Sequence, residues 1–232
     1  MLTHYTVIMT LGFRVFPSPS RAPKETIAAL ARHAVSNLCD SMGRTHNAAG
    51  GALRPMHRGG KLCGPALTVR TAPGDNLLIH KAIDMAQPGD IIVVDGGGAL
   101  DAALLGDIMT SYAVTRSVAG FVIDGAVRDT EELAIRDLPV YARGISPRGP
   151  TREGPGEINV TVSIGGTVVH PGDIVVGDAD GLVFVPPAQA DAVLAAVNAL
   201  LAKERGLLDS IAQGKADRRW LDETLKAKGC TL

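Results

Sequence analysis

The chain has 232 residues, of which 46% are hydrophobic, and a formal net charge of -1. This length and composition can bury the core of one domain, which excludes disorder for most of the chain. Lysine and arginine (23) balance aspartate and glutamate (24), and aromatic residues make up 3%, so the sequence offers no surface typical of nucleic-acid binding. We therefore expect a small-molecule substrate and no nucleic-acid partner.

The N-terminal segment bears on localisation. No run reaches the ~18 apolar residues of a membrane helix, so we expect no membrane partner. Residues 1–16 lack the basic region and cleavage site of a secretory signal, which favours the cytoplasm, although the absence of acidic residues before Glu25 is also compatible with a transit peptide. The three cysteines are widely spaced, without the pattern of a zinc site, and we expect reduced thiols.

Hydrophobic periodicity and turn residues predict alternating helices and strands. In chain order these are a helix over 24–42, a strand over 64–71, a helix over 77–86 with Asp75 as its N-cap, a strand over 91–94, a helix over 110–117, a strand over 120–123 followed by a turn at Asp124-Gly125, a short helix from 130, strands over 140–143, 158–164, 167–169, 173–176 and 182–185, a helix over 188–205 and a helical tail over 215–228. Such alternation predicts an α/β fold. We divide the chain into a leader and linker (1–22), a single α/β domain (23–214) and a C-terminal helical tail (215–232).

Three loops stand out between these elements. The basic loop 50–60 could attract an anion or be an ordinary solvated loop. The loop 95–98 resembles a nucleotide loop only superficially, because Asp101 stands where the last glycine of the dinucleotide pattern belongs. The loop 144–156 is dense in proline, glycine and arginine and is a candidate lid or subunit contact.

Arg128 and Asp129 follow the strand predicted at 120–123, and open α/β sheets bind ligands at the carboxyl ends of their strands. The alternative is an ordinary helix start, at which Asp129 caps the first turn and Arg128 is solvated. Upstream, Gly106 and Asp107 begin a predicted helix, which leaves the backbone N–H groups of Ile108 and Met109 free to bind a carboxylate or phosphate. We expect the two segments to face one pocket.

The order of these motifs resembles that in the family of regulator of ribonuclease E activity A and the metal-dependent 4-hydroxy-4-methyl-2-oxoglutarate aldolases. The likeness runs from about Thr26 to about Glu204. The motifs that carry it are Gly64-Pro65-Ala66, Gly74-Asp75-Asn76, Gly106-Asp107, Val122 to Asp129, Ala142-Arg143-Gly144, Pro171-Gly172-Asp173 and Asp178 to Gly181.

This resemblance implies a β/β/α swivelling-type layered domain with C-terminal helices, assembled into homotrimers or homohexamers with active sites between subunits. In the aldolase branch, the position matching Asp129 binds magnesium or manganese, and the position matching Arg128 contacts the keto oxygen of the substrate. The stretch matching Gly106 to Met109 holds the pyruvate-like carboxylate. Asp107 and a glutamate of the neighbouring subunit, best matched by Glu204, hold metal-bound waters.

The implied function is a class II aldolase that cleaves a 4-hydroxy-2-oxo acid, such as 4-hydroxy-4-methyl-2-oxoglutarate or 4-carboxy-4-hydroxy-2-oxoadipate, to pyruvate, with oxaloacetate decarboxylase side activity. A pyruvate enolate needs a lysine Schiff base or a metal as electron sink, and no lysine lies in the two motif loops, which favours a metal. Oxygen ligands suit magnesium or manganese. The alternative is a non-catalytic regulator that binds a ribonuclease or another protein; Asp107 favours the enzyme.

Overall fold

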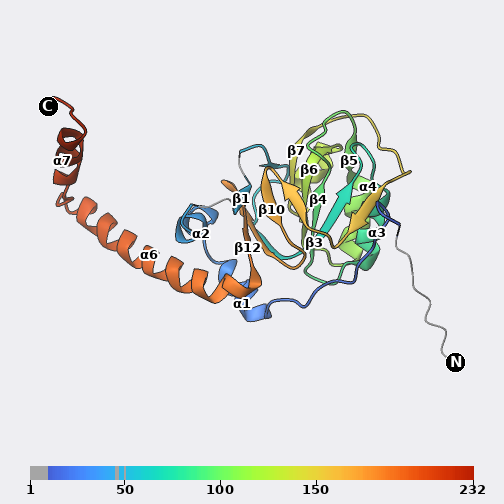
Figure 1. The fold of residues 1–232 in the computed structure, drawn as a ribbon, viewed down its shortest axis with the longest axis horizontal. Coiled ribbons are helices and arrows are strands. Elements are labelled where there is room, and N and C mark those ends of the chain that lie inside the picture. The colour runs from blue at the N-terminus through green and yellow to red at the C-terminus, as the bar shows by residue number, and fades with distance from the viewer. Residues whose placement is uncertain (1–9, 45–46, 50) are drawn as a thin grey trace.

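A mixed β-sheet organises the chain, which the computed structural model describes over residues 10–44, 47–49 and 51–232 (Figure 1). Residues 1–9 of the expected leader and Gly50 of the expected basic loop lie outside the described residues. Helices cover one face of the sheet, and a small β-hairpin packs on the opposite face. Further helices pack against the antiparallel strands at one end of the sheet. The predicted α/β class and the C-terminal helices are confirmed.

The strands of the described residues are β1 (Ala48–Ala49), β2 (Arg54–Pro55), β3 (Leu62–Thr71), β4 (Ile91–Asp95), β5 (Ala103–Leu105), β6 (Gly120–Val127), β7 (Val140–Ile145), β8 (Gly156–Ile158), β9 (Val162–Ile164), β10 (Thr167–Val169), β11 (Ile174–Asp178) and β12 (Gly181–Val185). The helices are α1 (Lys24–Leu30), α2 (Val35–Ser41), α3 (Leu77–Met85), α4 (Asp107–Thr115), α5 (Thr130–Ile135), a 3-10 turn (Pro187–Gln189), α6 (Ala190–Ala212) and α7 (Arg219–Ala227). No helix among them is long and apolar enough to cross a membrane.

The sheet has the order β1-β12-β11-β3-β4-β6-β7-β2, with β5 paired to β6 and β8 paired to β3. Its central strands β3, β4, β6 and β7 are parallel, whereas β11 runs antiparallel beside β3 and β12 runs antiparallel beside β11. The four apolar residues of β4 are all buried, as their unbroken β-branched pattern predicts for a parallel strand covered on both faces. The parallel strands therefore end at a common edge.

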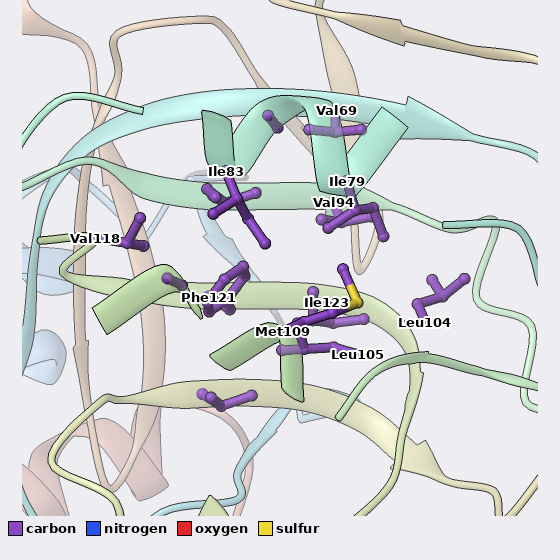
Figure 2. Close-up of a cluster of buried hydrophobic side chains, with 14 of the residues drawn as sticks. Val69, Ile79, Ile83, Val94, Leu104, Leu105, Met109, Val118, Phe121 and Ile123 are labelled. Atoms are coloured by element: carbon purple, nitrogen blue, oxygen red, sulfur yellow. The ribbon is translucent and has the colours of Figure 1, made fainter. Parts of the chain in front are cut away.

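The largest apolar cluster lies between the sheet and helices α3 and α4 (Figure 2). Ile79 and Ile83 are one helical turn apart on α3 and are fully buried against the strands. Met109 of α4 lies close to Ile123 of β6 and to Leu105 at the end of β5. Because this packing fixes the start of α4 against the strand ends, it also fixes the loops at this edge.

Two further clusters cover the remaining surfaces of the sheet. Residues of the β9–β10 hairpin pack on the opposite face, with Tyr141 and Phe184 fully buried there. Helices α1, α2 and α6 pack against β11 and β12. Burial raises the pKa of the Cys63 thiol to about 11 beside this third cluster, and all three cysteines are free thiols, as expected.

The single helix predicted over 24–42 is wrong, because the chain forms α1 and α2 with a break between them. Ala34 is extended (φ -73°, ψ 146°) and begins α2. Leu30 of α1 and Val35 and Leu38 of α2 all bury against the same cluster. The ammonium group of Lys61 lies 3.3 Å from the carbonyl oxygen of His33 and supports the free end of α1.

Three strand predictions also need correction. The expected turn at Asp124-Gly125 is absent, because β6 runs through it to Val127 and buries all eight residues. The Asp124 carboxylate is satisfied there by an ion pair with Arg143. The expected strand 158–164 is two strands, β8 and β9, separated by residues 159–161, of which Asn159 has a φ of +56° and ends the first ladder. Strand β5 is not predicted from the sequence, because its three residues are too few to show a period.

The segment before α1 packs on the domain, whereas the C-terminal helices project from it. Val15 pairs with Ile158 of β8, and the Arg14 side chain forms an ion pair with the buried Glu157. At the other end α6 leaves the body on the side opposite α3 and α4, and α7 follows it (Figure 1). Leu208 of α6 and Trp220 of α7 are exposed.

Candidate functional site

The candidate site forms where β5 and β6 end side by side. These strands pair in parallel, with Leu105 opposite Val127. The next residue of each strand, Gly106 and Arg128, therefore lies at the same edge, and the Arg128 N–H donates a hydrogen bond of 3.0 Å to the Leu105 carbonyl. The two sequence segments expected to face one pocket are thus brought together by a strand pair.

Asp129 occupies the N-cap position of α5 in the left-handed conformation (φ 55°, ψ 47°). Its side chain does not cap α5, so the alternative of an ordinary capping aspartate is wrong. Instead, Oδ2 of Asp129 accepts a hydrogen bond of 2.8 Å from the backbone N–H of Asp107, the first residue of α4. Among the described residues no hydrogen bond reaches Oδ1, which leaves that oxygen available to a ligand.

Position 106 requires glycine, because the side chains of Asp129 and Arg128 lie close to its backbone. A Cβ atom on Gly106 would lie 2.5 Å from Oδ2 of Asp129 and 3.0 Å from Cγ of Arg128. Both distances are at or below the closest that non-bonded atoms normally tolerate, so only glycine lets the start of α4 pass beneath the charged pair.

Arg128 lies over the start of α4 and beside the loop 144–156. Its Nε is 3.7 Å from Oδ2 of Asp129, and 40% of its side chain is exposed. A Cβ on Gly149 would lie 3.3 Å from Nη1 of Arg128, so the loop passes close to the guanidinium. The guanidinium is therefore flanked by protein on two sides and still open to a small ligand.

A pocket opens between α3, the end of β5, the start of α4 and this loop. Its lining residues are Asn76, His80, Ala103, Leu104, Leu105, Gly106, Ile108, Met109, Arg128, Pro150 and Arg152. Two arginines and no carboxylate belong to this lining, so its charge favours an anion. Helix geometry leaves the N–H groups of Ile108 and Met109 without a partner inside α4, at the positive end of its dipole.

Asn76 and His80 form the α3 side of the pocket. Nδ2 of Asn76 donates to the Leu104 carbonyl at 3.2 Å, whereas its Oδ1 is buried with no partner in the described residues. Nε2 of His80 is likewise buried and unpartnered there. Burial, and secondly the Arg152 guanidinium, lower the pKa of His80, so the ring is neutral at neutral pH.

Asp75 ties the loop 144–156 to the start of α3. Its Oδ1 accepts the Leu77 N–H at 3.0 Å, as expected of a residue at a helix start, although Asn76 is the N-cap. Its Oδ2 accepts the Thr151 hydroxyl at 2.8 Å and the Glu153 N–H at 2.6 Å. Burial acts to raise the pKa of Asp75, but these hydrogen bonds outweigh it and hold the pKa below its ordinary value. Arg152, between the two tethered residues, is thereby held at the pocket.

The Asp107 side chain has an ionic partner that the sequence does not predict. Its Oδ1 forms an ion pair with the guanidinium of Arg136, the residue that follows α5. No sequence signal marked Arg136. Asn76 belongs to a motif singled out in the sequence and Arg152 to a loop noted for its arginines, whereas nothing in the pattern distinguished His80 from a surface residue.

Glu204 does not join these residues within one chain. It lies on α6, which leaves the body on the opposite side from α4 (Figure 1), and its Oε2 accepts a hydrogen bond of 3.1 Å from Nδ2 of Asn37. Its expected role toward a neighbouring subunit stays a prediction.

The donor atoms at the site are hard oxygens. Among the described residues no three histidine, cysteine or acidic side chains converge closely enough to enclose a metal ion. Asp129 and Asp107 stand at two helix starts, which are joined by the hydrogen bond from the Asp107 backbone N–H to the Asp129 carboxylate. This set fits Mg²⁺ or Mn²⁺, which are commonly held by one or two carboxylates and keep several waters, better than it fits zinc.

Comparison with known families gives one match that covers most of the chain. The family model described as RraA-like, Aldolase/RraA, matches residues 35–184. This range includes both segments of the site and the loop 144–156.

Individual relatives agree with this match. A protein of Halalkalibacterium halodurans named "Putative 4-hydroxy-4-methyl-2-oxoglutarate aldolase" is 42% identical over 142 residues, which cover 61% of this chain and 68% of the relative. The solved structure of Streptomyces coelicolor RraAS2, titled an unusual member of the RNase ES inhibitor RraA family, has a TM-score of 0.72 at 26% identity and covers 84% of this chain and 98% of its own. The RNA-processing inhibitor RraA of Thermus thermophilis has a TM-score of 0.62 at 32% identity and covers 66% and 93%.

Proposed function

The chain belongs to the RraA-like family of aldolases and RraA proteins, and on that premise we propose that it is a divalent-metal-dependent aldolase that releases pyruvate from a 4-hydroxy-2-oxo acid. The observation that carries the proposal is the meeting of Asp107, Arg128 and Asp129 at the ends of β5 and β6. A cation and two carboxylates beside a helix N-terminus suit a reaction that develops an enolate next to a carboxylate.

The metal would be Mg²⁺ or Mn²⁺. Asp129 would hold the ion and Asp107 would bind one of its waters, in keeping with the oxygen donors present. When bound, the ion would supply Lewis-acid polarisation of the 2-keto oxygen.

Protein groups bind the substrate carboxylate, stabilise the developing charge and accept the proton. The free N–H groups of Ile108 and Met109 bind the carboxylate beside the keto group, as helix N-termini do. Arg128, charged at any working pH, stabilises the negative charge that develops on the keto oxygen while the carbon–carbon bond breaks. Asp107 accepts the proton of the 4-hydroxyl group, directly or through a water, which starts the retro-aldol cleavage. The described pocket lining contains no lysine that could form a Schiff base instead.

The second half of the substrate meets Arg152. Because the lining holds two arginines and no carboxylate, it matches a substrate with at least two carboxylates, one beside Arg128 and one beside Arg152. Both 4-hydroxy-4-methyl-2-oxoglutarate and 4-carboxy-4-hydroxy-2-oxoadipate meet this requirement. Oxaloacetate also carries two carboxylates and loses carbon dioxide through the same enolate, which supports a decarboxylase side activity.

Assembly into a homotrimer or homohexamer completes the proposal. The second half of α6 projects from the body and exposes Leu207, Leu208 and Ile211. Such a stripe favours contact with another copy of the chain, and a neighbouring Glu204 would reach the metal-bound water from such a copy.

A coupled assay for pyruvate tests the function. The protein is incubated with oxaloacetate, and separately with a 4-hydroxy-2-oxo dicarboxylate, in the presence of Mg²⁺ and after chelation. Metal-dependent pyruvate release from both supports the aldolase. The likeness to RraA inhibitors favours the second candidate, a non-catalytic regulator that binds a ribonuclease or another protein, and absence of release from either substrate would leave that candidate standing.

A further inference from the structure

The ion pair between Asp107 and Arg136 links two helices at the rim of the site. Asp107 begins α4, and Arg136 follows the last residue of α5. The Arg136 side chain is 25% exposed and the Asp107 side chain 36% exposed. The pair is therefore partly covered by protein on the Arg136 side, unlike a fully exposed surface ion pair.

Helix α5 positions both carboxylates of the site. Asp129 stands at its N-cap, and Arg136 stands at its other end. The backbone N–H of Asp107 is bonded to Oδ2 of Asp129, and Oδ1 of Asp107 is bonded to Arg136. With its main chain and one oxygen fixed in this way, Asp107 has only Oδ2 left to face a ligand.

A second observation indicates that the ion pair between Arg136 and Asp107 does more than stabilise the fold. Nε of Arg136 is buried without a hydrogen-bond partner among the described residues. An unsatisfied buried donor reduces stability, and in native proteins such groups call for an explanation, which is often functional. The side chain therefore reaches Asp107 at a cost to the fold.

From this geometry we propose that Arg136 is a positioning residue, which holds the Asp107 carboxylate in the orientation that lets Oδ2 receive the 4-hydroxyl proton and bind a metal-bound water. The inference rests on the proposed function, because it assigns Arg136 a role through Asp107. A guanidinium suits the role, since its planar fork fixes a carboxylate more rigidly than an ammonium does.

A double-mutant cycle tests the coupling, with Arg136→Met, Asp107→Asn and the double variant. Arg21→Met is the matched control, because the Arg21 side chain is similarly buried (29% exposed) and forms an ion pair with an aspartate outside the site, Asp90. Three quantities are measured for each protein: kcat and KM for pyruvate release, the dissociation constant of Mn²⁺ from the electron paramagnetic resonance of free Mn²⁺, and the melting temperature.

We expect Arg136→Met to lower kcat or Mn²⁺ affinity roughly 10- to 100-fold, the usual effect of removing a group that orients a metal-site residue, with KM changed much less. Arg136→Lys should recover part of the loss, and Arg21→Met should cause none of it. In the Asp107→Asn background, Arg136→Met should have almost no further effect.

Two results would overturn the inference alone: an unchanged Arg136→Met enzyme, or an equal loss from Arg136→Met with and without the Asp107 carboxylate. If the parent protein releases no pyruvate but binds Mn²⁺, the cycle is read in the Mn²⁺ constants, with coupling in support and additivity against. A parent that neither releases pyruvate nor binds Mn²⁺ overturns the proposed function and this inference with it.

Discussion

The backbone N–H of Asp107 donates a hydrogen bond of 2.8 Å to Oδ2 of Asp129, across 22 positions of sequence. This contact joins the start of α4 to the start of α5, where the Asp129 carboxylate lies beside the Arg128 guanidinium. The proposed chemistry depends on it, because the same contact leaves one oxygen of Asp129 free and fixes where the helix N–H groups point.

Asp129→Asn should abolish metal-dependent pyruvate release while leaving the fold intact. Asparagine tolerates the left-handed conformation found at this position and can still accept the Asp107 hydrogen bond. It lacks the charge that holds a divalent cation. The melting temperature checks that the fold is intact, and a Mg²⁺ titration of activity checks the loss of metal binding. A variant that keeps the parent's Mg²⁺ dependence would count against the metal assignment.

Arg128→Lys should lower kcat for pyruvate release by about 100-fold or more, the typical loss when a group that stabilises an oxyanion is removed. A lysine keeps the charge but cannot reproduce the guanidinium fork. Steady-state kinetics with oxaloacetate measure the effect, and a parent-like kcat would show that Arg128 does not stabilise the transition state.

Gly106→Ala should inactivate the enzyme through geometry alone. The new methyl group would overlap Oδ2 of Asp129 and press on Arg128. Gly51→Ala is the matched control, because a Cβ at Gly51 would approach only Nη2 of the Arg54 side chain, at an ordinary distance of 3.4 Å. We expect loss of pyruvate release only in the first variant; full activity in both would contradict the described packing.

Arg152→Ala should change substrate preference rather than chemistry. We expect KM for a 4-hydroxy-2-oxo dicarboxylate to rise roughly tenfold or more, the usual effect of losing a hydrogen bond to a charged group. KM for a 4-hydroxy-2-oxo monocarboxylate should stay near the parent value. Equal effects on both substrates would show that Arg152 does not bind the second carboxylate.

Asp75→Asn should alter how stability depends on acid. An aspartate with a lowered pKa in the folded protein contributes stability that is present above its unfolded pKa of about 3.9 and is lost as pH falls through its folded pKa. The parent should therefore be more stable than Asp75→Asn at pH 7, and the difference should shrink below about pH 4. Urea unfolding from pH 7 to pH 3 measures it, and a constant difference would contradict the role of the charge.

Most helices and strands of the fold could be predicted from local sequence patterns. Strand β4 and helix α3 each lie within one residue of their predicted bounds. The turn expected at Asp124-Gly125 is wrong because its signal is local, whereas β6 continues through these residues by pairing with β4 as far as Asp124 and with β5 and β7 beyond it. The missed strand β5 has three residues and takes its form from pairing with β6.

Some residues of the candidate site could be predicted from sequence motifs, and others could not. Gly106, Asp107, Arg128 and Asp129 form compact sequence motifs, so a resemblance could single them out. Arg136 acts from the far end of a helix, and its importance follows only from where α4 packs against α5. Asn76, His80 and Arg152 likewise converge through tertiary contacts, which a single sequence does not encode in any short spacing.

The central claim is that Asp129 holds a divalent ion where Arg128 and the start of α4 stabilise a pyruvate enolate. Exchange of the pyruvate methyl protons in D₂O, followed by proton NMR, tests this most directly because it needs no knowledge of the second half of the substrate. The claim predicts that the methyl signal decays with the protein and Mg²⁺, and persists after chelation or in the Asp129→Asn variant. A methyl signal that persists with the parent protein and Mg²⁺, or decays equally after chelation, would contradict it.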